Sequence, residues 1–60
     1  MRYRVTVNFG NGTREVREFD AYVKAYALFT NLVDFVPLCG ISDLELSQHE
    51  NGNFRALAIY

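Results

Sequence analysis

The chain contains very few of the residues from which disulfides, metal sites and catalytic centres are built. Its 60 residues include a single cysteine, Cys39, and a single histidine, His49. One thiol cannot close a disulfide within the chain, and these two residues alone cannot supply the tetrahedral ligand set of a zinc site. We therefore expect no metal and no cofactor. The lack of a disulfide framework in so short a chain is typical of a reducing compartment and predicts a cytoplasmic protein.

Long apolar runs and a charge excess of one sign are also lacking. No stretch approaches the ~20 apolar residues of a membrane span, and Met1 to Arg4 lead into alternating residues instead of the apolar run of a signal peptide. The net charge of −1 gives no overall attraction to nucleic acid or to acidic membranes. The sequence thus predicts a soluble protein without a membrane partner, in which any electrostatic binding is local.

What the chain does contain is enough apolar material for one small core. Half of the residues are hydrophobic, and five Phe and four Tyr are among them, which argues against intrinsic disorder. A chain of this length buries only ~60% of the surface that its unfolded form exposes, so we expect one domain over residues 1–60. Scaffolds of this size commonly rely on disulfides, a metal or oligomerisation. Because the first two are not expected here, the composition favours self-association.

The first third of the sequence predicts a β-hairpin. Residues 2–9 alternate between apolar and polar side chains, as a half-buried strand requires. Asn11-Gly12 is the dipeptide that best tolerates the two positive φ angles of a type I′ turn, and it predicts a returning strand over 13–19. With these two residues as the loop, Val7 lies opposite Val16 and the apolar faces of the two strands agree.

The spacing of apolar residues then changes to that of a helix, which we predict up to Val36. Phe19 and Asp20 resemble a hydrophobic staple and an N-cap, and Pro37 and Gly40 end the helix. The side that should cover a sheet carries Ala21, Tyr22, Ala25, Leu28, Phe29, Leu32 and Val36. The outer side carries Val23, Tyr26, Ala27 and Val33.

The last third predicts a second hairpin, with strands over 41–49 and 54–60 around an Asn51-Gly52 loop. This register places Leu44 opposite Ile59 in the core and Leu46 opposite Leu57. The other face of the last strand then carries Phe54, Ala56, Ala58 and Tyr60.

Together these elements predict an α+β fold of the ββαββ type, with one helix packed on one face of a four-stranded antiparallel sheet. A right-handed crossover through the helix favours the strand order 2-1-3-4. That order sets Arg2 and Arg4 on the open face, where we expect them beside Asp43 and Glu45. It also makes the second and fourth strands the edges. The second carries four charged residues that protect it from pairing, whereas the fourth carries only Arg55.

Cys39 and His49 are the side chains best suited to nucleophilic or acid-base catalysis near neutral pH. The sequence places no base near Cys39, and an unpaired cysteine is usually a buried apolar residue. His49 is interpreted as an ordinary exposed residue opposite Phe54. We therefore expect no catalytic residue and no enzymatic activity.

Two groups of apolar residues exceed what the predicted core needs. They are Val23, Tyr26, Ala27 and Val33 on the helix and Phe54, Ala56, Ala58 and Tyr60 on the last strand. Contiguous exposed apolar patches indicate an interaction surface. The leading prediction is a non-enzymatic, homodimeric protein-interaction module whose partner binds at these residues. In the alternative interpretation the helix or strand is rotated, and these residues complete the core.

The basic residues support a second function. Four of the six lie in the first hairpin, and Arg2, Arg4 and Arg17 near aromatic rings would suit a single-stranded nucleic acid. Asp43 and Glu45 on the same face, and the acidic net charge, weigh against this alternative.

The whole outline resembles many short uncharacterised proteins of bacteriophages and mobile elements. The features that carry the resemblance are the Asn11-Gly12 turn, Phe19-Asp20, the helix residues Ala25, Phe29 and Leu32, and the leucine-alternating second hairpin. Such proteins often modify or inhibit a host protein, including host defence systems. The resemblance implies a stand-alone binder and transfers no site residue.

Overall fold

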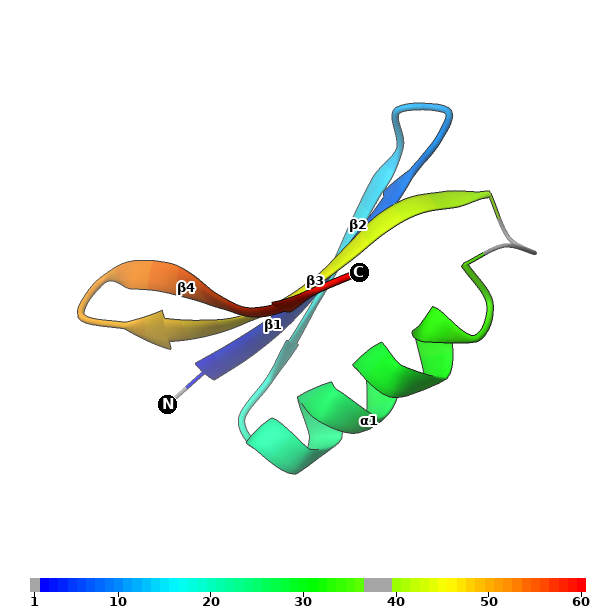
Figure 1. Cartoon of the computed structure of the whole chain (residues 1–60). Coiled ribbons are helices and arrows are strands. Elements are labelled where there is room, and N and C mark those ends of the chain that lie inside the picture. The colour runs from blue at the N-terminus through cyan, green and yellow to red at the C-terminus, as the bar shows by residue number, and fades with distance from the viewer. Residues whose placement is uncertain (1, 37–39) are drawn as a thin grey trace.

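The computed structural model describes residues 2–36 and 40–60, and it contains four strands and one helix (Figure 1). The elements are β1 (Arg2–Phe9), β2 (Arg14–Phe19), α1 (Tyr22–Val33), β3 (Ile41–Glu50) and β4 (Asn53–Ile59). All pairings are antiparallel and the sheet has the order β2-β1-β3-β4. The predicted α+β fold and strand order are confirmed.

Helix α1 covers one face of the sheet and leaves the other face open (Figure 1). Within the described residues the helix backbone lies close to β1, β3 and β2 but not to β4. The buried apolar core accordingly comes from the helix and the two central strands. It consists of Val5 and Val7 of β1, Ala25 and Phe29 of α1, and Ile41, Leu44 and Leu46 on β3.

The first hairpin turns through three residues, so the predicted two-residue loop is wrong. Phe9 donates its N–H to the carbonyl of Thr13 (2.8 Å), and Gly12 donates to the carbonyl of Phe9 (3.1 Å). Gly12 has a φ of 91°, the left-handed conformation that closes three-residue loops of this kind. The Asn11 side chain stabilises the longer loop because its Oδ1 accepts a hydrogen bond from the Thr13 N–H (3.0 Å).

The extra loop residue shifts the pairing of β2 by one position. Val7 lies opposite Glu15, and Val16 lies opposite Thr6 on the open face. Because side chains alternate along a strand, a one-residue shift moves every β2 side chain to the opposite face. Glu15 and Arg17 therefore face the helix side, and Val16 is 44% exposed.

The second hairpin has the predicted turn, but its two strands pair in a different register at the end away from the turn. Asn51 and Gly52 have φ angles of 52° and 82°, as a type I′ turn requires. A β-bulge then changes the register, so that Leu46 pairs with Ala58 instead of Leu57. Beyond the bulge Leu44 and Tyr60 exchange two backbone hydrogen bonds of 3.1 and 3.0 Å.

The bulge reverses the faces predicted for the end of β4. Ala58 lies opposite Leu46 and packs against the core on the helix side. Ile59 lies opposite Glu45 on the open face and is 69% exposed. The prediction that Ile59 belongs to the core is wrong, because the sequence-based register did not include an unpaired residue.

The helix is shorter than predicted. Its N-cap is Ala21, without a side-chain capping bond, whereas the carboxylate of Asp20 lies 3.6 Å from the Lys24 ammonium group. The helix ends at Val33, and residues 34–36 form a turn in which Phe35 donates to the Leu32 carbonyl. The predicted stop at Pro37 lies outside the described residues.

One helix residue, Val33, lies on the side opposite to the predicted one. Val33 packs against the core because it follows Ala25 and Phe29 at i, i+4 spacing. Tyr22 lies on the predicted side, because its ring meets the edge of the Tyr3 ring of β1 with centroids 5.6 Å apart. It is nevertheless 44% exposed, and it also stacks on the Tyr26 ring.

Candidate functional site

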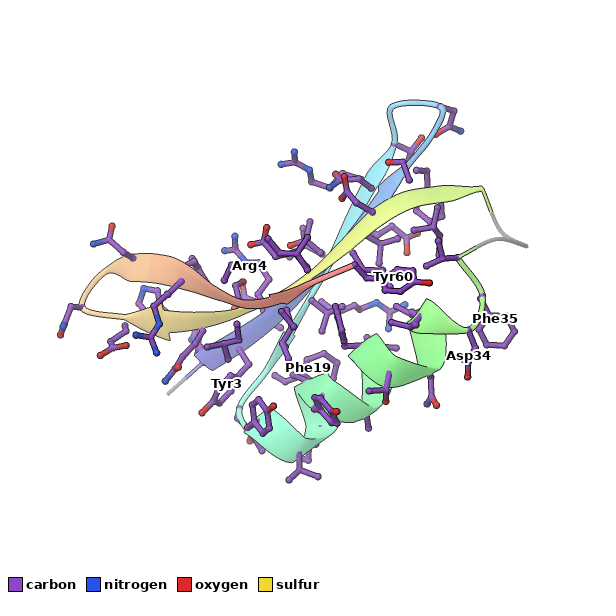
Figure 2. The ribbon with its side chains drawn as sticks, in the orientation of Figure 1. Tyr3, Arg4, Phe19, Asp34, Phe35 and Tyr60 are labelled. Carbon is purple, nitrogen blue, oxygen red and sulfur yellow. The ribbon has the colours of Figure 1, made fainter. Side chains whose placement is uncertain are left out.

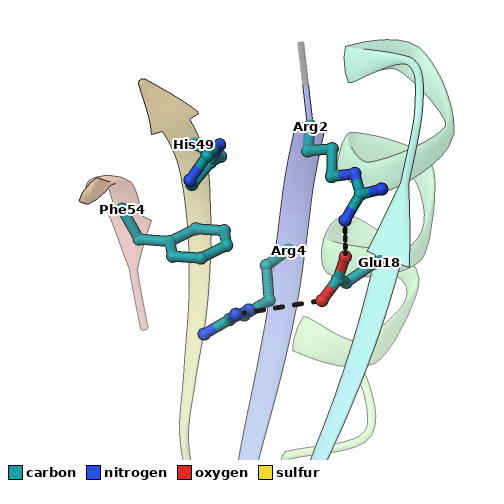
Figure 3. A pocket seen from close by; sticks show the side chains of 5 residues that line it. All are labelled: Arg2, Arg4, Glu18, His49 and Phe54. Carbon is teal, nitrogen blue, oxygen red and sulfur yellow. Dashed lines mark hydrogen bonds and ion pairs between the residues drawn. The ribbon is translucent and has the colours of Figure 1, made fainter. Parts of the chain in front are cut away.

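The open face of the sheet carries a pocket to which all four strands contribute one or two side chains (Figure 3). Its volume is about 340 Å³, and it is lined by Arg2, Arg4, Glu18, His49 and Phe54. We call these five residues the polar pocket. The strand register assembles it directly, since Arg2 lies opposite His49, Arg4 opposite Glu18, and His49 opposite Phe54.

The carboxylate of Glu18 lies between the two guanidinium groups of the polar pocket (Figure 3). Its Oε1 is 3.4 Å from a terminal nitrogen of Arg2, and its Oε2 is 3.8 Å from a terminal nitrogen of Arg4. Strong charge-assisted hydrogen bonds measure about 2.7–2.9 Å, so both contacts are loose. Such exposed pairs contribute little to stability, which leaves Glu18 free to move aside.

Arg4 is the central side chain of the polar pocket. Its guanidinium carbon lies 3.6 Å from the centroid of the Phe54 ring, a cation–π geometry, and the His49 ring centroid is 4.8 Å from that of Phe54. The Nε of Arg4 is shielded from solvent and has no hydrogen-bond acceptor among the described residues. Beneath this stack Ser47 is 1% exposed, and its hydroxyl donates to the Arg4 carbonyl (3.4 Å).

The predicted neighbours of the two arginines lie elsewhere. Because β1 and β3 are antiparallel, the start of β1 meets the end of β3, and Asp43 lies opposite Asn8. The Asn8 amide donates to Asp43 and its Oδ1 accepts from Arg14 Nε (2.9 Å). The acidic end of this face is thus separate from the polar pocket, whose carboxylate is Glu18.

Arg17 does not join Arg2 and Arg4. It lies on the helix side of β2, at a cleft of about 380 Å³ between the helix and the sheet. The other residues that line this cleft are Val7, Phe9, Glu15, Leu28, Leu32, Phe35 and Ile41. The one-residue register shift therefore divides the predicted nucleic-acid-binding arginines between two faces.

A second candidate surface is the edge formed by β4. The strand order leaves β2 and β4 as the edges of the sheet, and β4 carries a single charged side chain, Arg55. Of nine large exposed hydrophobic residues in the described part of the chain, four lie here: Phe54, Leu57, Ile59 and Tyr60. Leu57 and Ile59 were not predicted at the surface, because only the bulge turns this segment outward.

The structure separates the residues predicted to bind a partner. Phe54 and Ala56 lie on the open face, whereas Ala58 and Tyr60 lie on the helix side of β4, as Figure 2 shows for Tyr60. Val23, Tyr26 and Ala27 are exposed on α1, but Val33 packs against the core. In the described part of the chain the α1 backbone does not come close to that of β4, so the exposed helix residues and β4 are not neighbouring elements.

The described residues contain no group of three His, Cys, Asp or Glu side chains that could hold a metal ion. Cys39, weighed above as a nucleophile, lies outside the described residues. Helix α1, the only helix in the described residues, is too short to cross a membrane. Neither a protein-family model, nor a curated protein, nor a solved structure matches the chain.

Proposed function

We propose that the protein is a protein-interaction module that forms a homodimer by pairing β4 of one copy with β4 of a second copy. The observation that carries this proposal is the apolar, nearly uncharged β4 edge, which contrasts with the charged edge at β2. An unpaired edge strand presents backbone donors and acceptors to another chain, and strand addition is a recurring mode of protein recognition.

The backbone geometry of β4 supports pairing near its end. Tyr60 directs both its N–H and its carbonyl toward Leu44 of β3. Because these groups alternate in direction along an antiparallel strand, those of the preceding residue, Ile59, point to the outer edge. The Ile59 side chain is also largely exposed, so a second strand would gain backbone hydrogen bonds and apolar contact at the same position.

A second copy is the occupant that fits this edge best. The described core contains only seven buried apolar residues, and a domain of this size gains stability by association. A two-fold axis between the β4 strands of two copies would join their sheets and bury apolar residues of both copies. Arg55 is the single charged residue of β4. In an antiparallel pair of β4 strands the two copies of Arg55 would therefore face each other only if the pairing were centred on that residue.

Sedimentation velocity of the full chain, from low micromolar to millimolar concentration, tests the proposal. We expect a concentration-dependent dimer that Ile59→Lys converts to a monomer with an unchanged circular dichroism spectrum. Val23→Lys is the matched control, since Val23 is equally apolar and 76% exposed but lies on α1. It should leave the dimer intact.

A parent protein that stays monomeric at every concentration would overturn the homodimer. So would a dimer that dissociates in Val23→Lys and persists in Ile59→Lys, because the interface would then lie on the helix. If the parent protein is monomeric, the proposed partner of β4 becomes a host protein. The sequence resemblance to phage-type modulators implies such a partner.

A further inference from the structure

We propose that the polar pocket binds a phosphorylated nucleoside, either free or within a single strand, with its phosphate at Arg2 and Arg4 and its base stacked at Phe54 and His49. The pocket lies on the open face of the sheet, and the proposal does not depend on dimerisation through β4. It rests on the donor capacity of the arginines, the local charge, the size of the pocket and its aromatic rings.

The arginines retain unused hydrogen-bond donors. Each guanidinium carries five N–H groups, yet the two ion pairs with Glu18 engage one terminal nitrogen of Arg2 and one of Arg4. The shielded Nε of Arg4 has no acceptor among the described residues. A buried donor without a partner costs free energy, so a turn of the Arg4 side chain that brings this N–H to a phosphate oxygen is favourable.

The local charge favours an anion. Arg2 and Arg4 against Glu18 leave one net positive charge with His49 neutral. The Glu18 carboxylate already lies where an anion meets both guanidinium groups (Figure 3). Because its contacts are long and its side chain is 45% exposed, a phosphate can replace it without disturbing the sheet.

The pocket is larger than a phosphate group requires. At ~30 Å³ for each water molecule, a volume of about 340 Å³ holds roughly eleven waters, which leaves room for an organic group beside the anion. The rings of Phe54 and His49 and the plane of the Arg4 guanidinium line this space. Bases stack on such aromatic and guanidinium surfaces in proteins that bind single strands.

Proton–nitrogen NMR titrations of the full chain test this site with four probes: adenosine 5′-monophosphate, inorganic phosphate, phosphotyrosine and a short oligothymidylate. The nucleotide should shift the Nε–H signal of Arg4 and the amide signals of His49 and Phe54, and should bind more tightly than inorganic phosphate. Tighter binding of the oligothymidylate than of the mononucleotide assigns the site to a strand, and the reverse assigns it to a free nucleotide.

Three variants and one control separate the pocket from general electrostatics. Arg2→Gln should weaken nucleotide binding about ten-fold, and Phe54→Ala at least about five-fold. Glu18→Gln removes the competing carboxylate with little change of shape, so binding should become tighter. Arg17→Gln removes the same charge as Arg2→Gln but from the opposite face, and binding should not change.

Three results would overturn the proposal. One is the absence of any shift of the Arg4 Nε–H signal with the nucleotide at millimolar concentration and low salt. Another is equal loss of binding in Arg17→Gln and Arg2→Gln, which would show unspecific attraction. The third is binding of phosphotyrosine but not of the nucleotide, which would assign the pocket to a phosphorylated peptide. Glu18→Gln and Arg2→Gln keep the test decisive even if Phe54→Ala unfolds the hairpin.

Discussion

Arg4 of β1 and Phe54 of β4 meet above β3, with the guanidinium carbon 3.6 Å from the ring centroid. The two strands are not neighbours in the sheet, so their side chains bridge the strand between them. Ser47 of β3 lies opposite Arg4 on one side and opposite Ala56 on the other, and it is buried although it belongs to the open face. The contact thus links β4, the strand that lies away from the helix backbone, to the centre of the sheet.

A double-mutant cycle measures the interaction free energy between Arg4 and Phe54. We expect Arg4→Gln and Phe54→Ala each to lower the free energy of unfolding, with a coupling of about 0.5–2 kcal/mol between them, because a partly desolvated cation–π pair contributes in that range. Urea denaturation followed by circular dichroism gives the four free energies. Additive effects would show that the two side chains are neighbours without a significant interaction.

The fold was predictable because its signals are local. Strict alternation in β1, helical spacing around Ala25 and Phe29, and two Asn-Gly turns determine the order and type of the elements, and the structure confirms them. The connection between the hairpins then leaves few plausible strand orders. The order found in the structure, β2-β1-β3-β4, is the one predicted.

The polar pocket was not predictable as a whole, because it depends on register. A loop longer by one residue moves Glu18 to the open face and Arg17 away from it. One signal for the longer loop was available: only this register places Phe19 beside Tyr3 on the apolar face. The sequence contains no such signal for the bulge in β4. Residues 56–59 are all apolar, so no alternation of apolar and polar residues shows which of them face the core.

The loop of the first hairpin can be tested with two glycines. Gly12→Ala should lower the free energy of unfolding by about 1–2 kcal/mol, because a side chain is unfavourable at its φ of 91°. Gly10 has no positive φ, and a Cβ there would lie 3.6 Å from the Gly40 carbonyl oxygen, an ordinary contact. Gly10→Ala should therefore change stability by less than about 0.5 kcal/mol. Equal costs in urea denaturation would contradict this loop geometry.

The bulge in β4 predicts opposite outcomes for neighbouring residues. Ala58→Lys should destabilise the domain by about 1–3 kcal/mol, because it forces a larger, charged side chain against the core. Ile59→Lys should stay within about 0.5 kcal/mol of the parent, since Ile59 is largely exposed. Thermal and urea unfolding at the lowest practical protein concentration keep association out of the comparison. The reverse order of stabilities would restore the register without a bulge.

The rotation of α1 can be tested with one substitution at two positions. Val→Ala raises helix propensity by up to about 0.5 kcal/mol wherever it is made in a helix. At Val23, which is 76% exposed, this gain should be the whole effect, and the free energy of unfolding should rise slightly. At Val33 the lost methyl groups pack against the core, and at ~0.8 kcal/mol for each buried carbon the variant should be less stable by about 1 kcal/mol. Equal effects in urea denaturation would mean that Val33 lies at the surface, as the sequence alone predicts.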